Sequence, residues 1–188
     1  MVMTLLSDAC ALFFLWIFAQ AGLHKMTQAN AHYYSNLALQ YFNLYQGLND
    51  DVKKAQQLSW LNRAIKAIGA IEFSLALLVV VPSTRTFATV CIIVVLLSYM
   101  AMMAAQLYQG KKAMDCGCGG ASQLKISGAL LVRNLAYCVM ALLCLSSGQL
   151  IFSSATVVIF VIAFAAISLN LIIEQLIAND QQLKLLNN

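Results

Sequence analysis

Residues 5–26 read LLSDACALFFLWIFAQAGLHKM, an apolar stretch that ends close to the polar pair His24-Lys25. A helix needs roughly 20 mostly apolar residues to cross the hydrocarbon core of a bilayer. Four more runs of similar length follow, at residues 65–81, 87–108, 126–146 and 151–173. The sequence therefore predicts five transmembrane helices.

The composition of the 188-residue chain agrees with a membrane protein. Hydrophobic residues make up 62% and charged residues 10%, and the mean hydropathy is +0.80. Globular proteins carry roughly 25% charged residues, so these values indicate a chain that is solvated by lipid. A single proline suits helices, because backbone groups inside a bilayer must be paired within their own segment. We expect an all-α integral membrane bundle in one domain, residues 1–188, with a four-helix core and a fifth transmembrane helix.

The connection between the first two spans, residues 27–64, is polar and rich in tyrosine. Aromatic and leucine side chains recur there at steps of three and four residues: Tyr33, Tyr34, Leu37, Tyr41, Leu44 and Tyr45. This spacing predicts an amphipathic helix that lies in the headgroup layer of the membrane. A helix packed over the end of the bundle explains the same pattern, and the two interpretations are compatible.

Loop charges predict the orientation. Alternating spans place most of the basic residues on one face: Lys25, Lys53, Lys54, Lys111, Lys112, Lys125 and Lys184, with Arg63 and Lys66 at its border. The opposite face holds only Arg85. The positive-inside rule then puts the loop of residues 109–125 in the cytoplasm. The net charge of +4 is too diffuse for a nucleic-acid surface, so we expect no nucleic-acid partner.

The loop of residues 109–125, named the cysteine loop below, contains Cys116 and Cys118 in the hexapeptide Asp-Cys-Gly-Cys-Gly-Gly, residues 115–120. Flanking glycines leave a thiol exposed and its backbone free to bend. The other four cysteines, Cys10, Cys91, Cys138 and Cys144, lie singly in apolar runs, where cysteine is usually a small hydrophobic residue. An accessible thiol pair at a membrane surface indicates thiol–disulfide exchange or soft-metal handling.

Two ionisable residues lie inside predicted spans. Glu72 and Arg133 each lie about seven residues from the face of the cysteine loop, which is roughly 10 Å deep at 1.5 Å per residue. A lone charge at that depth is costly, so we predict that the two form an ion pair beneath the loop. The pair is either a clamp between two helices or part of the catalytic site, where a guanidinium favours the thiolate.

His24 is the candidate proton acceptor for a cysteine thiol. It shares a helix face with Gln20, four residues earlier. The alternative is an ordinary polar residue at the membrane interface. Gln106 and Asn134 come from the same end of the bundle, whereas Asn170 and Glu174 are expected to face the aqueous boundary with no special role.

Together these features resemble the MauE-type (methylamine utilisation) membrane proteins, which are related to the DoxX-like group. The matching features are the His24-Lys25 pair, the tyrosine-bearing connection, Glu72, the cysteine hexapeptide and Arg133 followed by Asn134. The resemblance covers about residues 5–145. One departure is Gly119, where family members typically have phenylalanine.

The resemblance implies a factor of the bacterial inner membrane that assists disulfide formation or the maturation of exported proteins. Its expected partner is a thioredoxin-like, MauD-type protein. The layout is also distantly similar to DsbB and vitamin K epoxide reductase proteins, in which a cysteine pair faces a quinone cofactor. Those proteins use Cys-X-X-Cys-type pairs and carry a second pair in another loop. No second pair lies on the cysteine-loop face here, so a partner must supply it, and a quinone is correspondingly less expected.

The sequence thus leaves three hypotheses. The first is a thiol–disulfide redox protein, either an oxidoreductase or an accessory subunit of one, with Cys116, Cys118, Arg133, Glu72 and His24 at its site. The second is a copper, zinc or mercury binder or transporter that uses Cys116, Cys118 and His24. The third is a structural subunit whose cysteines are incidental. Thiol chemistry at the periplasmic face would also conflict with the charge count, so the side of the cysteine loop stays open.

Overall fold

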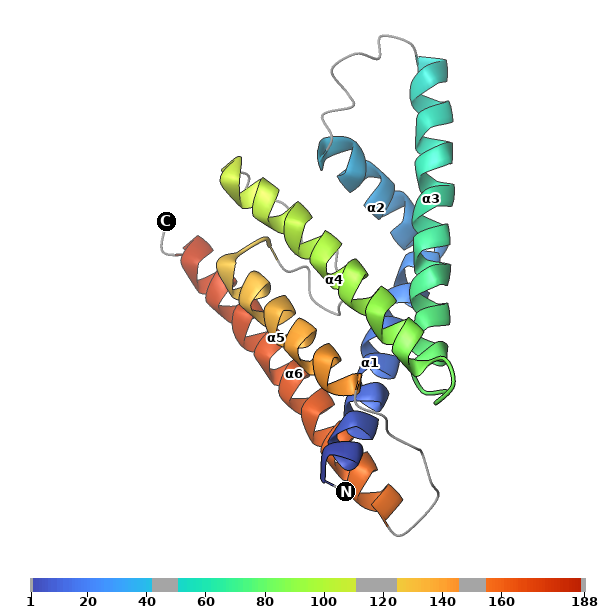
Figure 1. The fold of residues 1–188 in the computed structure, drawn as a ribbon. Coiled ribbons are helices and arrows are strands. Elements are labelled where there is room, and N and C mark those ends of the chain that lie inside the picture. Colours follow the sequence, from blue (N-terminus) through green and yellow to red (C-terminus); the bar gives the residue numbers. More distant parts are fainter. Residues whose placement is uncertain (1, 42–50, 111–124, 146–154, 187–188) are drawn as a thin grey trace.

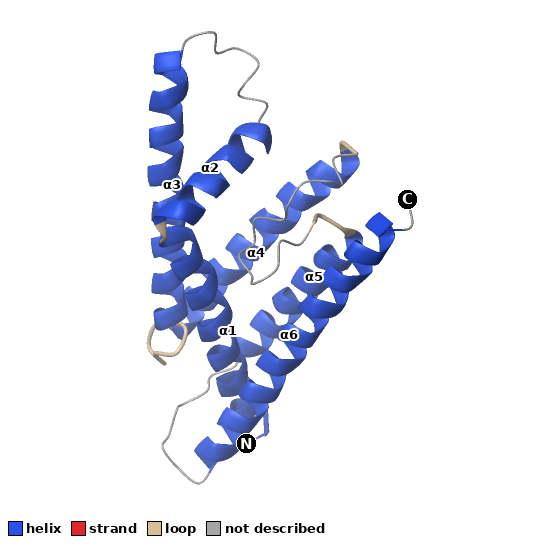
Figure 2. Ribbon diagram, turned by 180° about the vertical axis from the view of Figure 1, so that it is seen from behind, coloured by secondary structure: helices blue, strands red, loops and turns tan. Residues whose placement is uncertain are grey.

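The computed structural model describes residues 2–41, 51–110, 125–145 and 155–186. Within these ranges every element is an α-helix, as Figure 2 shows by colour. The helices are α1 (Val2–Met26), α2 (Gln28–Tyr41), α3 (Asp51–Leu78), α4 (Arg85–Tyr108), α5 (Gly128–Cys144) and α6 (Ala155–Leu186). The prediction of an all-α membrane bundle is therefore confirmed.

Among the described residues, three helices are long and apolar enough to cross a membrane: Met3–Met26, Arg85–Tyr108 and Thr156–Leu183. Gly128–Cys144 is apolar but shorter. Helix α3 is longer than the predicted second span, because it begins at Asp51 and includes the second half of the polar connection. It ends at Leu78, four residues before Pro82, where a turn leads into α4.

Helix α2 forms the first half of the tyrosine-bearing connection. Its buried side chains include Ala31, Tyr34, Ser35 and Leu39, and the helix packs against α3 and α1. Tyr33 on its other side is exposed. This arrangement fits a helix packed on the bundle, whereas Leu44 and Tyr45 of the pattern lie outside the described residues.

Helix α1 is the centre of the fold. It packs most extensively against α3 and also contacts α6, α5 and α2, while α4 packs against α5 and α3. Helices α5 and α6 lie side by side in both views (Figures 1 and 2). Figure 1 also shows that α4 stops, α5 starts and the chain ends at one end of the bundle, named the α4–α5 end below. The N-terminus, the turn between α3 and α4 and the end of α5 lie at the other, the α3–α4 end.

The main core consists of aromatic and aliphatic side chains from four helices. Phe13, Phe14 and Phe18 of α1 meet Leu75 and Val79 of α3, Ile92 and Leu96 of α4, and Tyr137 of α5. The outer face of α6 is different, because Val157, Phe160 and Phe164 are exposed there. An apolar face without a protein neighbour suits contact with lipid tails.

Two glycines bring α1 and α3 into backbone contact. A Cβ atom placed on Gly22 would lie 2.6 Å from the carbonyl oxygen of Gly69 and 2.8 Å from the amide nitrogen of Phe73. A Cβ atom on Gly69 would lie 2.8 Å from the carbonyl oxygen of Gly22. Real Cβ atoms essentially never come so close, so only glycine permits this crossing. The crossing positions the charged residues described next.

Candidate functional site

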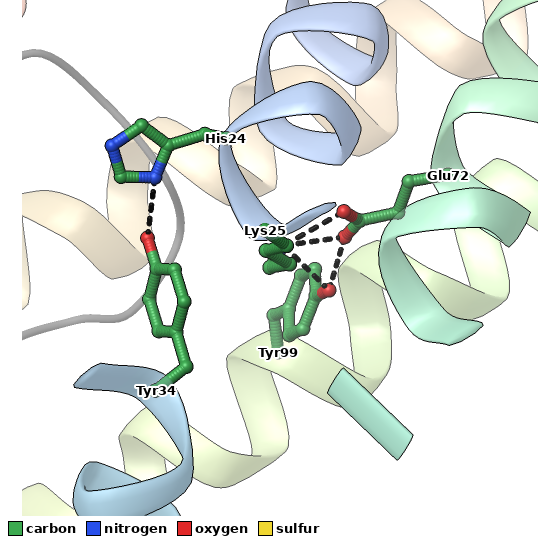
Figure 3. A network of polar contacts seen from close by, with 5 residues as sticks. All are labelled: His24, Lys25, Tyr34, Glu72 and Tyr99. Atoms are coloured by element: carbon green, nitrogen blue, oxygen red, sulfur yellow. Dashed lines mark hydrogen bonds and ion pairs between the residues drawn. The ribbon is translucent and has the colours of Figure 1, made fainter. Parts of the chain in front are cut away.

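A buried charged cluster joins α1, α3 and α4. Lys25 Nζ donates to both carboxylate oxygens of Glu72, at 2.7 and 2.8 Å, and lies 3.2 Å from the hydroxyl of Tyr99 (Figure 3). The Tyr99 hydroxyl in turn donates to Glu72 Oε1. Only 4% of Lys25 and 1% of Glu72 is exposed. Lys25 therefore does not act as a free loop charge, contrary to the count made from the sequence.

The glycine crossing explains why Lys25 and Glu72 meet. Lys25 follows Gly22 by three residues, and Glu72 follows Gly69 by three. Helices α1 and α3 run in opposite directions (Figure 1). Because side chains on a helix lean toward its N-terminus, Lys25 reaches back along α1 and Glu72 reaches back along α3. The two side chains are thus directed toward each other across the close contact.

The predicted ion pair between Glu72 and Arg133 is wrong. Arg133 Nη1 donates instead to Glu174 Oε1 of α6, at 2.8 Å, and the two side chains are 9% and 15% exposed. The prediction counted depth along each span and did not consider which face each residue occupies. A charge in an apolar environment pairs with the nearest opposite charge. For Glu72 this is Lys25, and for Arg133 it is Glu174.

Asn170 and Glu174 of α6 therefore do have a role, contrary to the expectation from the sequence. The Tyr137 hydroxyl of α5 donates to Asn170 Oδ1, and Asn170 Nδ2 lies 3.5 Å from Glu174 Oε1. The guanidinium carbon of Arg133 also lies 5.5 Å from the centre of the Tyr137 ring. These contacts form a row of polar side chains between α5 and α6. Asn170 and Glu174 lie four residues apart on one side of α6.

His24 contacts α2 and not a described cysteine. Its Nδ1 lies 3.1 Å from the Tyr34 hydroxyl, as Figure 3 shows, and the two rings meet edge to face. Thr27 and Asn30 donate to the carbonyl of His24, at 2.6 and 3.0 Å, and so satisfy a backbone group at the end of α1. His24 thus joins α1 to α2, and its role as a proton acceptor stays a prediction.

Cys116 and Cys118 lie in residues 111–124, outside the described residues, so their relation to Glu72, Arg133 and His24 is not described. The structure does describe both flanks of that segment. Gly110 follows α4 with a positive φ of 73°. On the other flank, the side-chain amide of Gln181 of α6 makes two hydrogen bonds with the backbone of Lys125. Its Oε1 accepts from the Lys125 N–H at 2.9 Å, and its Nε2 donates to the Lys125 carbonyl at 2.8 Å. Helix α6 therefore anchors the α5 side of the cysteine loop.

The sequence analysis missed a second buried ion pair, at the α3–α4 end. Arg85 Nη1 lies 2.6 Å from Asp8 Oδ1, and each side chain is 3% exposed. Arg85 also donates through Nε to the carbonyl of Val79, at 3.3 Å. The signal was present in the sequence, since Asp8 is an ionisable residue inside an apolar run and such a residue requires a partner. Arg85 had been assigned to a loop.

No group of three or more His, Cys, Asp or Glu side chains that could hold a metal ion occurs among the described residues. The candidate set of Cys116, Cys118 and His24 includes two residues outside that part of the chain. The soft-metal hypothesis therefore stays a prediction.

The fold and its buried ion pairs define a multi-pass helical membrane protein whose charged side chains are paired inside the bundle. The chain belongs to the MauE family, since the family model described as methylamine utilisation protein MauE matches residues 3–147. The matched range contains His24, Glu72, Cys116, Cys118 and Arg133, and it ends before α6 begins at Ala155. No curated protein and no solved structure matches the chain.

Proposed function

We propose that this protein is a membrane thiol–disulfide redox protein in which Cys116 and Cys118 exchange electrons with a thioredoxin-like partner. The exchange assists disulfide formation or maturation of exported proteins at the bacterial inner membrane. One observation carries the proposal. Of the six cysteines, four lie in helices, and the other two lie in the Asp-Cys-Gly-Cys sequence between α4 and α5, inside the range matched by the MauE family.

The chemistry is a reversible transfer of two electrons. A thiolate from one member of the pair attacks a sulfur of the partner's disulfide, and a mixed disulfide forms as the partner's other sulfur leaves. The second cysteine of the pair then attacks the mixed disulfide. The products are a Cys116–Cys118 disulfide and a reduced partner, and the reverse sequence returns the electrons. Gly117 between the two cysteines suits the small ring that this closure requires.

The buried charges hold the helices of the bundle together. The Lys25–Glu72–Tyr99 cluster ties α1 to α3 and α4, and the Arg133–Glu174 pair ties α5 to α6. We assign both a clamping role, because each charge has its opposite within hydrogen-bond distance. Arg133 is neutralised by Glu174, so its effect on a nearby thiolate is weaker than that of an unpaired guanidinium. His24 remains the side chain proposed to accept the thiol proton.

Redox trapping with alkylating reagents tests the proposal. Cells are quenched with acid, and the free thiols are tagged with a reagent that adds mass, with a Cys91→Ser/Cys138→Ser variant as the control for helix thiols. We expect Cys116 and Cys118 to resist tagging until a reductant is added, and Cys116→Ser or Cys118→Ser to accumulate a mixed disulfide with a thioredoxin-like protein. A membrane-impermeant reagent applied to whole cells and to inverted vesicles also reports the side on which the loop lies.

Two results would contradict the proposal. The first is a pair that is fully tagged without reductant under every growth condition. The second is unchanged disulfide formation in exported proteins of a strain with the Cys116→Ser/Cys118→Ser variant. The soft-metal alternative predicts instead that purified protein contains copper, zinc or mercury in near-stoichiometric amount and loses it in that double variant.

A further inference from the structure

Helix α3 forms one edge of the bundle in both views (Figures 1 and 2). One side of it packs against α1, α2 and α4, and that side carries the buried residues Leu61, Glu72, Leu75 and Ala76. The other side, named the outer face of α3 below, is exposed. Its residues follow one another at steps of three and four: Gln56, Trp60, Arg63, Ala67, Ile71, Ser74 and Leu77. The proposed thiol chemistry does not use this face.

The polarity of the exposed side chains changes along α3. Those before Trp60 include Gln56 and Ser59. Those after Arg63 are small or mostly apolar: Ala67, Ile68, Ala70, Ile71, Ser74 and Leu77. The Ser74 hydroxyl donates to the carbonyl of Ala70 at 2.8 Å, so it is satisfied within the helix. The helix continues for roughly 22 Å beyond Arg63, which is most of the ~30 Å hydrocarbon core. Trp60 and Arg63 therefore lie at the level where lipid tails meet headgroups.

Two basic residues lie at this level of α3. Arg63 is exposed, and Lys66 is half-buried one turn further along. The ion pairs among the described residues use other bases: Lys25, Arg85 and Arg133. On α3 itself, Glu72 is held by Lys25, and Asp51 lies roughly 18 Å from Arg63 along the helix axis. Neither carboxylate of α3 thus neutralises the two cations.

The direction of α3 aims both cations at the headgroup layer. Side chains on a helix lean toward its N-terminus, and the N-terminal part of α3 is the polar part. The guanidinium of Arg63 and the ammonium of Lys66 therefore reach outward, while the Lys66 stem covers apolar surface. Trp60 lies one turn nearer the start of α3 and is 66% exposed. Indole rings favour this level of a membrane, because the ring is apolar and its N–H donates a hydrogen bond.

We propose that Trp60, Arg63 and Lys66 bind the headgroup of an anionic phospholipid, whose acyl chains lie along the outer face of α3. Arg63 binds the phosphate through two parallel N–H groups, and Lys66 adds a second positive charge. The tails contact the apolar side chains that follow, among them Ile71 and Leu77, which are 57% and 52% exposed. A zwitterionic lipid carries its own ammonium group, which the two cations repel. The site is independent of the proposed thiol exchange.

Quenching of tryptophan fluorescence by brominated lipids tests this site, because the chain has two tryptophans. The Trp16→Phe variant keeps Trp60 as the reporter. The Trp60→Phe variant keeps Trp16, which is 47% exposed on α1 and serves as the control. Each full-length variant is reconstituted in phosphatidylcholine vesicles. Either phosphatidylglycerol or phosphatidylcholine with brominated acyl chains then replaces increasing fractions of the lipid, and the quenching curves give the ratio of the two binding constants.

We expect Trp60 to report phosphatidylglycerol bound at least about fivefold more tightly than phosphatidylcholine, since each basic residue near a membrane surface contributes about that factor. Trp16 should report a ratio of about one. A ratio of one at Trp60 as well would overturn the proposal.

Substitutions of Arg63 are made in the Trp16→Phe background. Arg63→Gln should lower the ratio at Trp60 about fivefold, whereas Arg63→Lys keeps the charge and should retain most of it. Gln56→Ala is the matched control, because it changes an uncharged exposed residue on the same face and should leave the ratio unchanged. An Arg63→Gln ratio equal to that of Gln56→Ala would refute the assignment of Arg63.

Free phosphate offers the same chemistry as a phospholipid headgroup, so a further comparison separates the two. The titration of the Trp16→Phe variant is repeated in sodium phosphate and in sodium chloride at equal ionic strength, so that screening of the charges is the same. We expect the same ratio in both salts, because the acyl chains hold the lipid headgroup at the site. A ratio that falls to one in phosphate alone would overturn the choice of a lipid.

Discussion

Replacing Glu72 by glutamine tests whether the Lys25–Glu72 pair holds the bundle together. Glutamine keeps the shape of the side chain and one acceptor for Tyr99, but it leaves the Lys25 ammonium without its counter-ion in a position that is 4% exposed. Removing one partner of a buried pair costs about 3–5 kcal/mol, because the remaining charge is desolvated and uncompensated. The two short contacts in the structure, 2.7 and 2.8 Å, put our expectation at about 4 kcal/mol.

The double variant Lys25→Met/Glu72→Gln separates the ion pair from packing. It removes both charges, so no uncompensated charge is left, and we expect a loss of only about 2 kcal/mol. The double variant should therefore be more stable than either single variant. Arg63→Gln is the control, because it removes an exposed charge from the same helix and should change stability by less than about 0.5 kcal/mol.

The free energy of unfolding is measured in detergent micelles by titration with sodium dodecyl sulfate, followed by circular dichroism and confirmed by steric trapping. If the double variant is less stable than both single variants, with losses that simply add, then Lys25 and Glu72 are not energetically coupled. The clamping role assigned to the cluster would then be refuted.

Three other substitutions test separate contacts. Gly22→Ala places a Cβ atom about 0.8 Å inside the ordinary 3.4 Å contact limit, so α1 and α3 must separate, and the unfolding free energy should fall by about 1–3 kcal/mol. Gly128→Ala is the control: its Cβ atom meets nothing within 4 Å, so it should leave the thermal midpoint unchanged. Tyr99→Phe removes a hydrogen bond to a charged group and should cost about 1.5–3 kcal/mol in unfolding free energy, whereas Tyr108→Phe, at a residue that is 94% exposed, should have no effect. Glu174→Gln leaves the Arg133 guanidinium without its counter-ion, so it should destabilise the contact between α5 and α6 by about 3 kcal/mol and raise the rate of proteolysis of α6. Equal rates of proteolysis in the variant and the wild type would contradict that contact.

Helix α6 gives the structure a feature that the family match does not cover. The match ends at residue 147, yet Glu174 of α6 neutralises Arg133, which lies within it. Gln181 of the same helix binds the backbone at Lys125, where the cysteine loop meets α5. Helix α6 therefore completes the polar contacts of the matched region and does not merely add a lipid-facing segment.

The class of the protein could be predicted from the sequence alone. Apolar runs of bilayer length determine helices without knowledge of packing, because a backbone in lipid must satisfy its own hydrogen bonds. The same reasoning identified Glu72 and Arg133 as residues that need partners inside the bundle.

The partners themselves were decided only by the tertiary structure. Depth along a span follows from counting residues, but the direction in which a side chain points depends on how each helix is rotated against its neighbours. The contact between Gly22 and Gly69 rotates α1 so that Lys25 reaches Glu72, and the packing of α6 on α5 gives Arg133 to Glu174. Likewise, Ser7 and Cys144 are 137 positions apart in the sequence. Only the packing of α1 on α5 brings the Ser7 hydroxyl to the carbonyl of Cys144, at 3.4 Å.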